Sequence, residues 1–556
     1  MKRISLVLFF VGTTLFAGRG QIPVSLDEVY EPVVVGIPPS DAFIGLSRME
    51  DGELRHYNYG AHPDSGHPLY LSSHDNGLTW KTVALPYELP YADQRSPRSD
   101  EYIRLFCTGS AVYAMRTEGG LEGGRTIIRI DDEAGIMNKP PIFIHGGKRI
   151  ISGAHRTDRS GAFVYYSDDD GRTWHTSTKV TVPPHQKGGF HQGVRWNHGA
   201  VEPTIVELND GRLWMIIRTS QDKHYQAFSE DGGETWSEAT PSPFYGTITM
   251  PTLYRMADGR LLFFWCNTTP LPELPTANGV WDDVFTNRDA VHVAISEDDG
   301  KTWKGMRELL LNVERNSSAF GDTRPGEDKS VHQVQAVEVT PGKILASVGQ
   351  HRLCRKLVMF DVDWLYESRR SCDFSDGLES WSAFRYYQGI VGHCCYNRQE
   401  MPLLVAHPDR PGKNAIHLGY MPNDSLVQDN DGAVWNFPVA PDGSVHVRLK
   451  LPQGSKGVQL VLNDRWFNPT DTVASYECMY TVPLSRNRLG IRDAEWHEVT
   501  VEWKKNRPAV LSVDGRKKGK LPLVRPTEHG VSYLHFLGGR IPDKTGIFID
   551  YVDGGK

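Results

Sequence analysis

The stretch SEDDGKTW at residues 296–303 has three further copies in this chain, all with the same internal spacing. Each octet carries Ser, Asp, Gly, Thr and Trp at equivalent positions, and the other copies are SHDNGLTW (73–80), SDDDGRTW (167–174) and SEDGGETW (229–236). An aspartate accepts hydrogen bonds from the backbone of a turn, and glycine adopts a positive φ without steric cost. We therefore predict that each octet is a tight hairpin turn, with its Trp covering the hydrophobic layer. A Ca²⁺-binding loop is the alternative interpretation of the same residues.

A second kind of turn precedes three of the octets. Asp-Gly between apolar residues predicts a β-hairpin, and it occurs in MEDGEL (49–54), LNDGRL (208–213) and MADGRL (256–261). The repeating unit is therefore strand, Asp-Gly turn, strand, strand, octet turn, strand, which is typical of one four-stranded propeller blade. Two units without an octet, at 103–130 and 332–350, fill the gaps. The sequence thus predicts six blades.

The octet disappears after about residue 372, and a different pattern follows. Apolar and polar residues alternate in HVRLKL (446–451) and GVQLVL (457–462), and Asp514-Gly515 marks a further hairpin. About 180 residues of this kind suit one β-sandwich. Within it, Trp466 and Tyr480 are candidates for a sugar-binding face, and the alternative is a structural domain that packs against the propeller.

These patterns predict an all-β chain with two domains. We expect a six-bladed β-propeller at residues 25–370, followed by a β-sandwich (jelly-roll) domain at residues 373–556. Residues 1–20 have the parts of a secretory signal peptide, with Lys2 and Arg3 ahead of an apolar run that is too short to span a bilayer. The sequence therefore predicts an exported protein, periplasmic or extracellular, with no membrane span.

Charge and cysteine content narrow the classes of partner. Lys and Arg number 61 against 68 Asp and Glu, so the formal net charge is −7, which argues against nucleic acid or an anionic membrane as the main partner. The seven cysteines include no CxxC pair, and no HExxH pattern is present, so we predict no metal site and no cofactor. Export would permit a Cys354–Cys372 disulfide, but buried thiols are the favoured interpretation.

Glu202 and Arg218 are brought together by their spacing in GAVEPTIVELNDGRLWMIIRT (199–219). The glutamate stands at the start of one predicted strand and the arginine, sixteen residues later, at the end of the next. A strand, a turn and a second strand return the chain to the same end of the sheet, so both side chains face one pocket. The alternative is a structural ion pair in the propeller wall.

Four such octets, known as Asp-boxes, in six predicted blades resemble the sialidase (neuraminidase) superfamily of BNR-repeat propellers over about residues 30–368. The resemblance implies a ligand at the propeller axis, with Glu202 as the catalytic base and Arg218 as a carboxylate-binding arginine. It implies the same substrate-binding role for Arg288 in NRDAVHV. The run WHEVTV at 496–501 is similar to laminin-G or concanavalin-like sandwiches.

The chain departs from the family pattern at two positions. The first blade of sialidases begins with Arg-Ile-Pro, where this chain has Ala42 and Phe43. The last blade supplies a nucleophilic tyrosine, where this chain has His332. A histidine titrates near neutral pH, so His332 is a candidate for a base, for a residue that orients a nucleophile, or for substrate binding. A hydrogen-bonded core histidine is the alternative.

Further candidates lie on the predicted loops. The resemblance implies a general acid on the loop after the first blade's second strand, where Asp64 is the nearest carboxyl; an ordinary turn-capping aspartate is the alternative. Trp196 and His198, on a histidine-rich loop, suit stacking on and hydrogen bonding to a sugar. Asp282, on a long insertion, is placed to shape specificity.

Together these residues predict a secreted, exo-acting glycoside hydrolase that removes an acidic or substituted terminal sugar from a glycan, as exo-α-sialidases do. A polysaccharide lyase is the first alternative, with His332 or a histidine of the histidine-rich loop abstracting a proton next to a uronate carboxylate. A non-catalytic carbohydrate-binding propeller is the second. Fold alone does not select among them, because function depends on the site. The sequence says nothing about oligomeric state.

Overall fold

The computed structural model describes residues 23–556 except 24, 39–44, 62–67, 85–93, 136–139, 191–192, 196–198, 272, 274–285, 319–328, 350–353, 387–389, 392–393, 396–397, 402, 423–429 and 540. The described chain is all-β, as predicted, and its helical elements are short: α1 (Arg486–Leu489), η1 (Leu26–Glu28), η4 (Val362–Tyr366) and η5 (Thr472–Ser475). None of the described helices is long and apolar enough to cross a membrane. The predicted signal peptide lies outside the described residues.

Six antiparallel sheets follow one another along the first two thirds of the described chain. Sheet 1 holds β2 (Leu46–Arg48), β3 (Leu54–Ala61), β4 (Pro68–Ser73) and β5 (Lys81–Ala84). Sheet 2 holds β6 (Gln94–Arg95), β7 (Tyr102–Thr108), β8 (Ala111–Glu118) and β9 (Gly124–Asp131). Sheet 3 holds β10 (Ala134–Gly135), β11 (Ile142–Ile144), β12 (Arg149–Arg156), β13 (Ala162–Ser167) and β14 (His175–Thr176).

The next three sheets complete this series. Sheet 4 holds β15 (Val201–Glu207), β16 (Leu213–Arg218), β17 (Lys223–Ser229) and β18 (Thr240–Tyr245). Sheet 5 holds β19 (Thr252–Arg255), β20 (Leu261–Trp265), β21 (Ala290–Ser296) and β22 (Lys304–Leu311). Sheet 6 holds β23 (Gln335–Thr340), β24 (Lys343–Val348), β25 (Lys356–Asp361) and, from the N-terminal side of the chain, β1 (Val33–Gly36).

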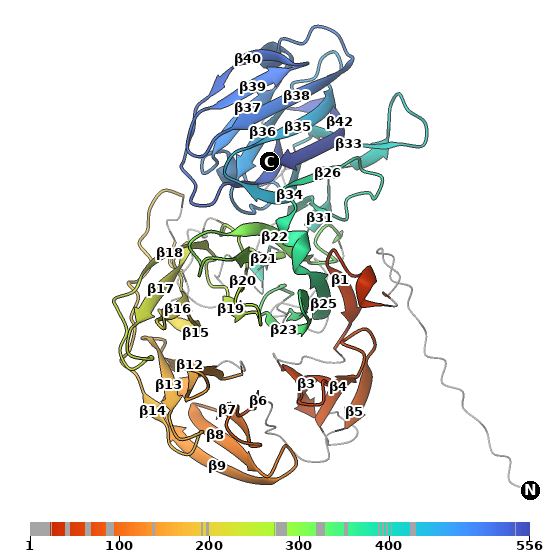
Figure 1. The fold of residues 1–556 in the computed structure, drawn as a ribbon. Coiled ribbons are helices and arrows are strands. Elements are labelled where there is room, and N and C mark those ends of the chain that lie inside the picture. The colour runs from red at the N-terminus through yellow and green to blue at the C-terminus, as the bar shows by residue number, and fades with distance from the viewer. Residues whose placement is uncertain are drawn as a thin grey trace, which may run out of the picture.

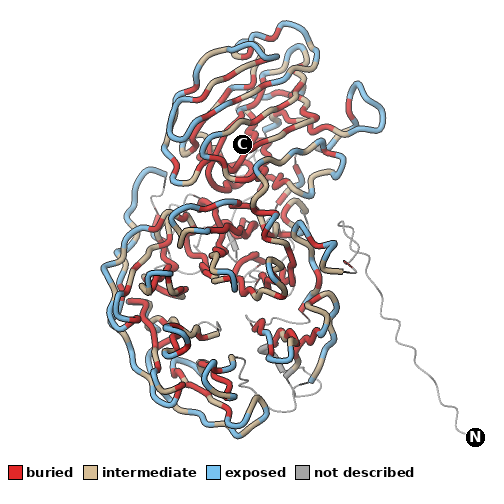
Figure 2. The backbone as a smooth tube through the Cα atoms, in the orientation of Figure 1, coloured by how far each residue is buried: buried red, intermediate tan, exposed pale blue. Residues whose placement is uncertain are grey.

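The six sheets form a closed ring (Figure 1). Closure comes from β1, which pairs with β25 so that Val33 lies opposite Met359. Each neighbouring pair of sheets shares its own buried apolar cluster, including sheets 6 and 1, which enclose Leu46, Leu54 and Leu345. Burial therefore follows the ring, with buried segments inside each sheet and exposed turns at its outer edge (Figure 2). Apolar packing between neighbouring sheets thus stabilises the ring.

The four octets are the predicted hairpin turns between the last two strands of sheets 1, 3, 4 and 5. In each, the serine hydroxyl donates to the aspartate at 2.7–2.9 Å, and the threonine hydroxyl donates to the same carboxylate at 2.5–2.6 Å. The glycines have φ of 81–92°. Both oxygens of each aspartate therefore serve the turn, as its sequence predicted.

Two larger sheets form the C-terminal part of the chain. Sheet 7 holds β26 (Arg369–Cys372), β32 (Leu403–Ala406), β33 (Asn414–Tyr420), β35 (Gly443–Lys450), β38 (Trp496–Trp503), β39 (Ala509–Val513), β40 (Arg516–Leu521) and β42 (Asp543–Gly555). Sheet 8 holds β27 (Trp381–Ser382), β34 (Gly432–Ala440), β36 (Val458–Asn463), β37 (Tyr480–Leu484) and β41 (Val531–Gly538). One buried cluster takes residues from both sheets. Short pairs connect them to the ring: β28 (Phe384–Tyr386) with β31 (Arg398–Glu400), and β29 (Ile390–Val391) with β30 (Cys394–Cys395).

Sheet 8 packs directly on sheet 5 of the ring. Trp466 is fully buried there, and its backbone exchanges two hydrogen bonds of 2.9 Å with Asn267 and Thr269. Tyr480 is also buried, and its hydroxyl donates to the Arg507 carbonyl at 2.6 Å. The prediction that Trp466 and Tyr480 mark a sugar-binding face is therefore wrong, because one packs between the two regions and the other lies in the core of the C-terminal sheets.

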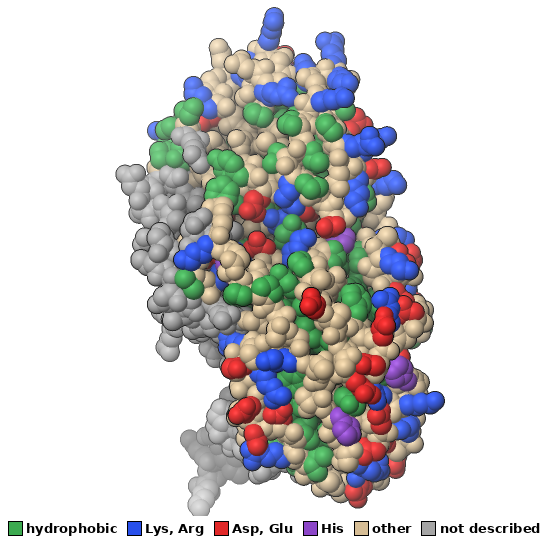
Figure 3. All heavy atoms as spheres, turned by 90° about the vertical axis from the view of Figure 1, so that its left-hand side faces the viewer, with side chains coloured by type: hydrophobic (Ala, Val, Ile, Leu, Met, Phe, Trp, Pro, Cys, Tyr) green, Lys and Arg blue, Asp and Glu red, His purple; other side chains and the backbone are tan. Residues whose placement is uncertain are grey.

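The surface carries charges of both signs. Figure 3 shows acidic and basic side chains interspersed over the ring, with lysines and arginines gathered at the far end of the C-terminal sheets.

All seven cysteines lie among the described residues, and none of them, Cys354 and Cys372 included, forms a disulfide. Among the described residues, no three His, Cys, Asp or Glu side chains come together as a metal-binding group.

Candidate functional site

Glu202 and Arg218 meet at one end of the β15–β16 hairpin, as their spacing predicted. Val201 pairs with Arg218 across the two strands. Nη1 of Arg218 donates to Oε2 of Glu202 at 2.6 Å, and the side chains are only 5% and 13% exposed. A buried, short hydrogen bond between opposite charges fixes both groups in place.

Electrostatics keeps Glu202 ionised. Burial by itself would raise the pKa of this carboxyl, but the charge and hydrogen bond of Arg218 outweigh that effect. His155 and Arg288 lower the pKa further, so that it lies below the ordinary value of 4.5. At neutral pH, Glu202 is therefore a carboxylate that can accept a proton or face a developing positive charge.

The backbone around this pair is strained. Glu202 has a φ of 48°, and the register of β15 against β16 shifts between Val201 and Thr204. Ile248 and Gln333, just ahead of β19 and β23, also have positive φ, at 51° and 59°. Non-glycine residues adopt this conformation at an energetic cost, and such strain is concentrated at functional sites. Three neighbouring sheets thus carry strain where their first strands begin.

Arg288 and His332 form a second buried pair. The two side chains belong to residues that are each 1% exposed, and Nη1 of Arg288 lies 2.9 Å from Nε2 of His332. A guanidinium has no acceptor, so Nε2 of His332 accepts this hydrogen bond. Arg288 also donates to the carbonyl of strained Ile248. The charge of Arg288 also lowers the pKa of Glu202, so this second pair influences the first electrostatically.

A cavity of about 280 Å³ opens beside this cluster. The first strands of sheets 4, 5 and 6 line it through residues such as Glu202, Thr252 and Gln335, and sheet 3 adds Ser152. Figure 1 shows these strands nearest the centre of the ring. Of the predicted site residues that the structure describes, only Glu202 lines the cavity, and Arg218, Arg288 and His332 do not. The other predicted site residues, Asp64, Trp196, His198 and Asp282, lie outside the described residues.

Sheet 3 contributes two residues that the sequence did not reveal as candidates. Nδ1 of His155, on β12, accepts a 3.4 Å hydrogen bond from the backbone N–H of Glu202. Arg159 follows on the β12–β13 hairpin, and its carbonyl accepts from Ala200 N–H at 3.4 Å. His155 precedes Glu202 by 47 residues and belongs to another sheet, so no local pattern points to it.

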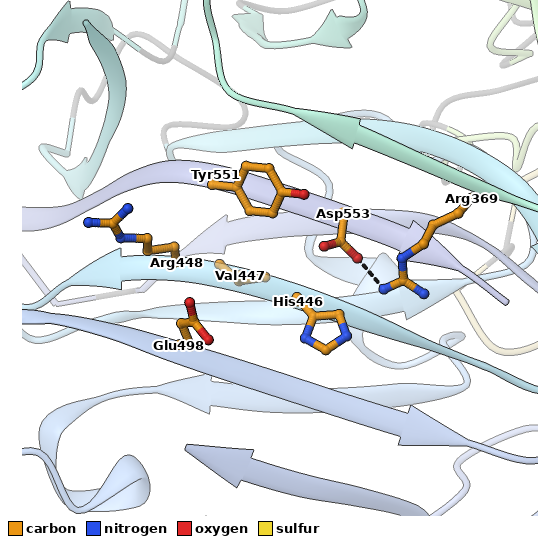
Figure 4. A pocket seen from close by; sticks show the side chains of 7 residues that line it. All are labelled: Arg369, His446, Val447, Arg448, Glu498, Tyr551 and Asp553. Atoms are coloured by element: carbon orange, nitrogen blue, oxygen red, sulfur yellow. Dashed lines mark hydrogen bonds and ion pairs between the residues drawn. The ribbon is translucent and has the colours of Figure 1, made fainter. Parts of the chain in front are cut away.

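A second hollow, of about 240 Å³, lies on the outer face of sheet 7 (Figure 4). It is lined by Arg369, His446, Val447, Arg448, Glu498, Tyr551 and Asp553. Arg369 pairs with Asp553 and also donates to Ser444 Oγ at 3.2 Å, while His446 bonds Thr500 at 3.0 Å. These groups are engaged with one another and belong to a different region from Glu202, so we place the candidate site at Glu202.

Residues 130–323 match the BNR repeat-like domain family, a span that contains three of the four octets. A sialidase of Vibrio cholerae serotype O1 is 27% identical over 183 residues, covering 28% of this chain and 20% of that protein, and the sialidase of a second strain matches equally. The matched part is thus a small share of those relatives' length.

Solved structures provide further comparisons. A Dyadobacter fermentans DSM 18053 protein of unknown function has a TM-score of 0.39 and 16% identity, covering 60% of this chain and 97% of that chain. A Trypanosoma rangeli sialidase has a TM-score of 0.31 and 13% identity, covering 92% and 91%. Residues 130–323 thus carry a BNR repeat-like domain that includes three of the octet turns, and the chain is similar to the sialidases of Vibrio cholerae.

Proposed function

We propose that this protein is an exported, exo-acting glycoside hydrolase of the sialidase-like kind, which removes an acidic or substituted terminal sugar from a glycan. The observation that carries the proposal is the buried Glu202–Arg218 pair on a strained bulge beside the ring's inner cavity. The match of residues 130–323 to the BNR repeat-like domain and the similarity to a Vibrio cholerae sialidase support it. The substrate is a glycan, and the reaction needs no cofactor.

The charges suggest how the site would work. Glu202 is ionised, so it serves as a base or stabilises the oxocarbenium-like positive charge that develops during glycoside cleavage. Arg218 and Arg288 would hold an anionic substituent of the sugar, since a guanidinium pairs well with a carboxylate. His332 would position Arg288 through the 2.9 Å hydrogen bond between them. Asp64 remains the proposed general acid.

The proposal extends to the domain organisation. We infer that residues 1–20 are a signal peptide, that sheets 1–6 are the blades of a six-bladed β-propeller at about residues 25–370, and that sheets 7 and 8 form a concanavalin- or laminin-G-like β-sandwich at about residues 373–556. The pairing of β26 with β42 supports a start of the sandwich at Arg369, slightly before residue 373. A protein with such a leader would act in the periplasm or outside the cell.

Two alternatives make different predictions. A polysaccharide lyase would need a base aimed at the substrate. His332 is buried and its Nε2 accepts from Arg288, so that base would have to be a histidine of the histidine-rich loop. A non-catalytic binding propeller would retain glycans without releasing any product.

One experiment separates the three functions. The protein is incubated with a panel of glycans that end in different acidic and neutral sugars, and the products are followed by mass spectrometry and by ultraviolet absorbance. Hydrolysis releases a free terminal sugar with the mass of one added water. Lyase action gives an unsaturated, absorbing product instead, and binding without any product would contradict both enzymatic functions.

A further inference from the structure

The conformation of Glu202 needs support from outside its own sheet. Its φ of 48° lies in the left-handed region, which residues with a side chain avoid. The bulge between Val201 and Thr204 interrupts the β15–β16 ladder at this residue, so the backbone N–H of Glu202 needs an acceptor elsewhere. Bulges beside functional sites redirect a side chain, and here the redirected side chain is the carboxylate that meets Arg218.

His155 supplies that acceptor. Its Nδ1 lies 3.4 Å from the backbone nitrogen of Glu202. A backbone N–H can only donate, so Nδ1 must be unprotonated, and a neutral imidazole then carries its proton on Nε2. Two residues earlier, Ala200 N–H donates to the carbonyl of Arg159, also at 3.4 Å. Sheet 3 thus accepts hydrogen bonds from the backbone N–H groups of both Ala200 and Glu202.

The place of the His155 ring depends on a glycine. Gly135 lies directly opposite His155 in the β10–β12 pairing. A Cβ atom at Gly135 would lie 3.0 Å from Nε2 and 3.1 Å from Cε1 of the ring, so the ring would have to shift by a few tenths of an ångström to admit it. The ring therefore lies over the bare backbone of Gly135, and a larger residue would push it from its position.

The surroundings of His155 favour its neutral form. Burial lowers its pKa below the ordinary value of 6.5, the charge of Glu202 opposes this effect, and the charges of Arg218 and Arg159 lower the pKa further. These are the charged groups that face the ring from sheet 4 and from its own hairpin.

We propose that His155 is a positioning residue, which holds Glu202 in its strained conformation through the Nδ1 hydrogen bond, and does so only while the imidazole is neutral. Protonation of His155 would put a proton on Nδ1, so that two donors, Nδ1–H and the backbone N–H of Glu202, would face each other and the hydrogen bond would break. The catalytic consequence rests on the proposed function, whereas the structural consequence does not.

The test compares three variants with the wild type. His155→Leu removes the acceptor, His155→Asn keeps an oxygen acceptor that does not titrate, and His175→Leu, at an exposed histidine of the same sheet, is the control. Hydrogen-exchange mass spectrometry follows the peptide that contains Glu202, with rates corrected for the intrinsic effect of pH. We expect His155→Leu to lose at least tenfold in protection of this peptide, and His155→Asn and the control to stay within threefold of wild type. The wild type should lose protection at acidic pH, and His155→Asn should not.

Turnover gives the second readout. We expect His155→Leu to lower kcat at least tenfold with KM within twofold, because Arg218 and Arg288 still bind the substrate. His155→Asn should recover most of the kcat that His155→Leu loses. Its kcat should not show the decrease at acidic pH that protonation of His155 causes in wild type. Equal protection in the wild type, His155→Leu and His155→Asn at every pH would overturn the proposal, whatever the activity. If wild type releases no sugar but the exchange pattern appears, the proposed function fails and the positioning role stands. If His155→Leu does not fold, wild type and His155→Asn still decide, because an equal loss of protection in acid in both would overturn the proposal.

Discussion

Oε2 of Glu202 lies 2.6 Å from Nη1 of Arg218, and both side chains are almost completely withdrawn from solvent. Breaking a buried ion pair on one side leaves the other charge unpaired, which costs far more than the pair contributes as a whole. The protonation state of Glu202 therefore depends on the charge of Arg218, and this dependence can be measured.

Arg218→Met should raise the pKa of Glu202, since burial remains and the opposing charge is gone. We expect the acidic limb of kcat/KM to move to higher pH, and the free energy of unfolding at pH 7 to fall by about 3–5 kcal/mol. In wild type, the lowered pKa of Glu202 stabilises the folded state at every pH above the ordinary pKa of a glutamate. This stabilisation is lost as the pH falls below that value. The stability difference between wild type and variant should therefore narrow in acid. Urea titrations from pH 3 to 8, with Arg212→Met as control, measure it, and a pH-independent difference would contradict the account.

The octet aspartates should stabilise the turns through their charge. Partial burial alone would raise the pKa of Asp231, but hydrogen bonds from Thr235 and Ser229 lower it to about 2. We expect Asp231→Ala to lower the free energy of unfolding by about 2 kcal/mol at neutral pH. Because the folded pKa is depressed, this contribution is lost as pH falls from about 4 towards 2. Guanidinium unfolding measures the effect, and an equal loss in Glu230→Ala, at the exposed neighbour, would assign it to something other than the carboxylate bonds.

Glu308 joins the ring to the C-terminal sheets and should make their contact sensitive to pH. Tyr533 donates to Oε1 of Glu308 at 2.8 Å, and the same hydroxyl lies 2.5 Å from Nε2 of His292. Burial raises the pKa of Glu308 to about 7, against the pull of Tyr533 and nearby arginines. A raised folded pKa gives stability that is present at acidic pH and lost as pH rises through about 7.

We therefore expect Glu308→Gln to gain stability relative to wild type between pH 6 and 8.5, because it keeps an acceptor for Tyr533 and never ionises. Differential scanning calorimetry across this range, with exposed Glu238→Gln as control, follows the shift in Tm. A difference in Tm between Glu308→Gln and wild type that is the same at pH 6 and 8.5 would count against a buried titrating carboxyl.

Four buried histidines should make the fold sensitive to acid. Burial is the main cause that lowers the pKa of His56 and His292 to about 3, and of His529 and His535 to about 4. Below pH 6.5 these histidines bind protons in the unfolded chain but stay neutral in the folded chain, so the free energy of unfolding decreases as the pH drops. Each neutral buried imidazole should lower the free energy of unfolding by about 2 kcal/mol at pH 5. The slope of unfolding free energy against pH near pH 5 reports proton uptake, and an uptake of less than one proton would contradict these buried neutral states.

The octets could be predicted from sequence because each turn is made of hydrogen bonds within eight residues. Glu202 and Arg218 could be found because a single hairpin joins them. The His155 contact could not, since it depends on a bulge at Glu202 and on the packing of one sheet against the next. The closure by β1 joins distant parts of the chain, with Val33 opposite Met359, and the burial of Trp466 depends on how the C-terminal sheets pack on the ring. Aromatic content alone therefore suggested a binding face where the molecule has an internal contact.

The most direct test of the account is the turnover of Glu202→Gln on the glycan that wild type cleaves. The substitution removes the carboxylate charge and keeps the shape of the side chain, and Glu230→Gln makes the same change at an exposed octet position. Circular dichroism first establishes that both variants are folded. We expect Glu202→Gln to lower kcat at least about 100-fold, while Glu230→Gln stays within twofold of wild type. A folded Glu202→Gln that releases the sugar at the wild-type rate would contradict the central claim.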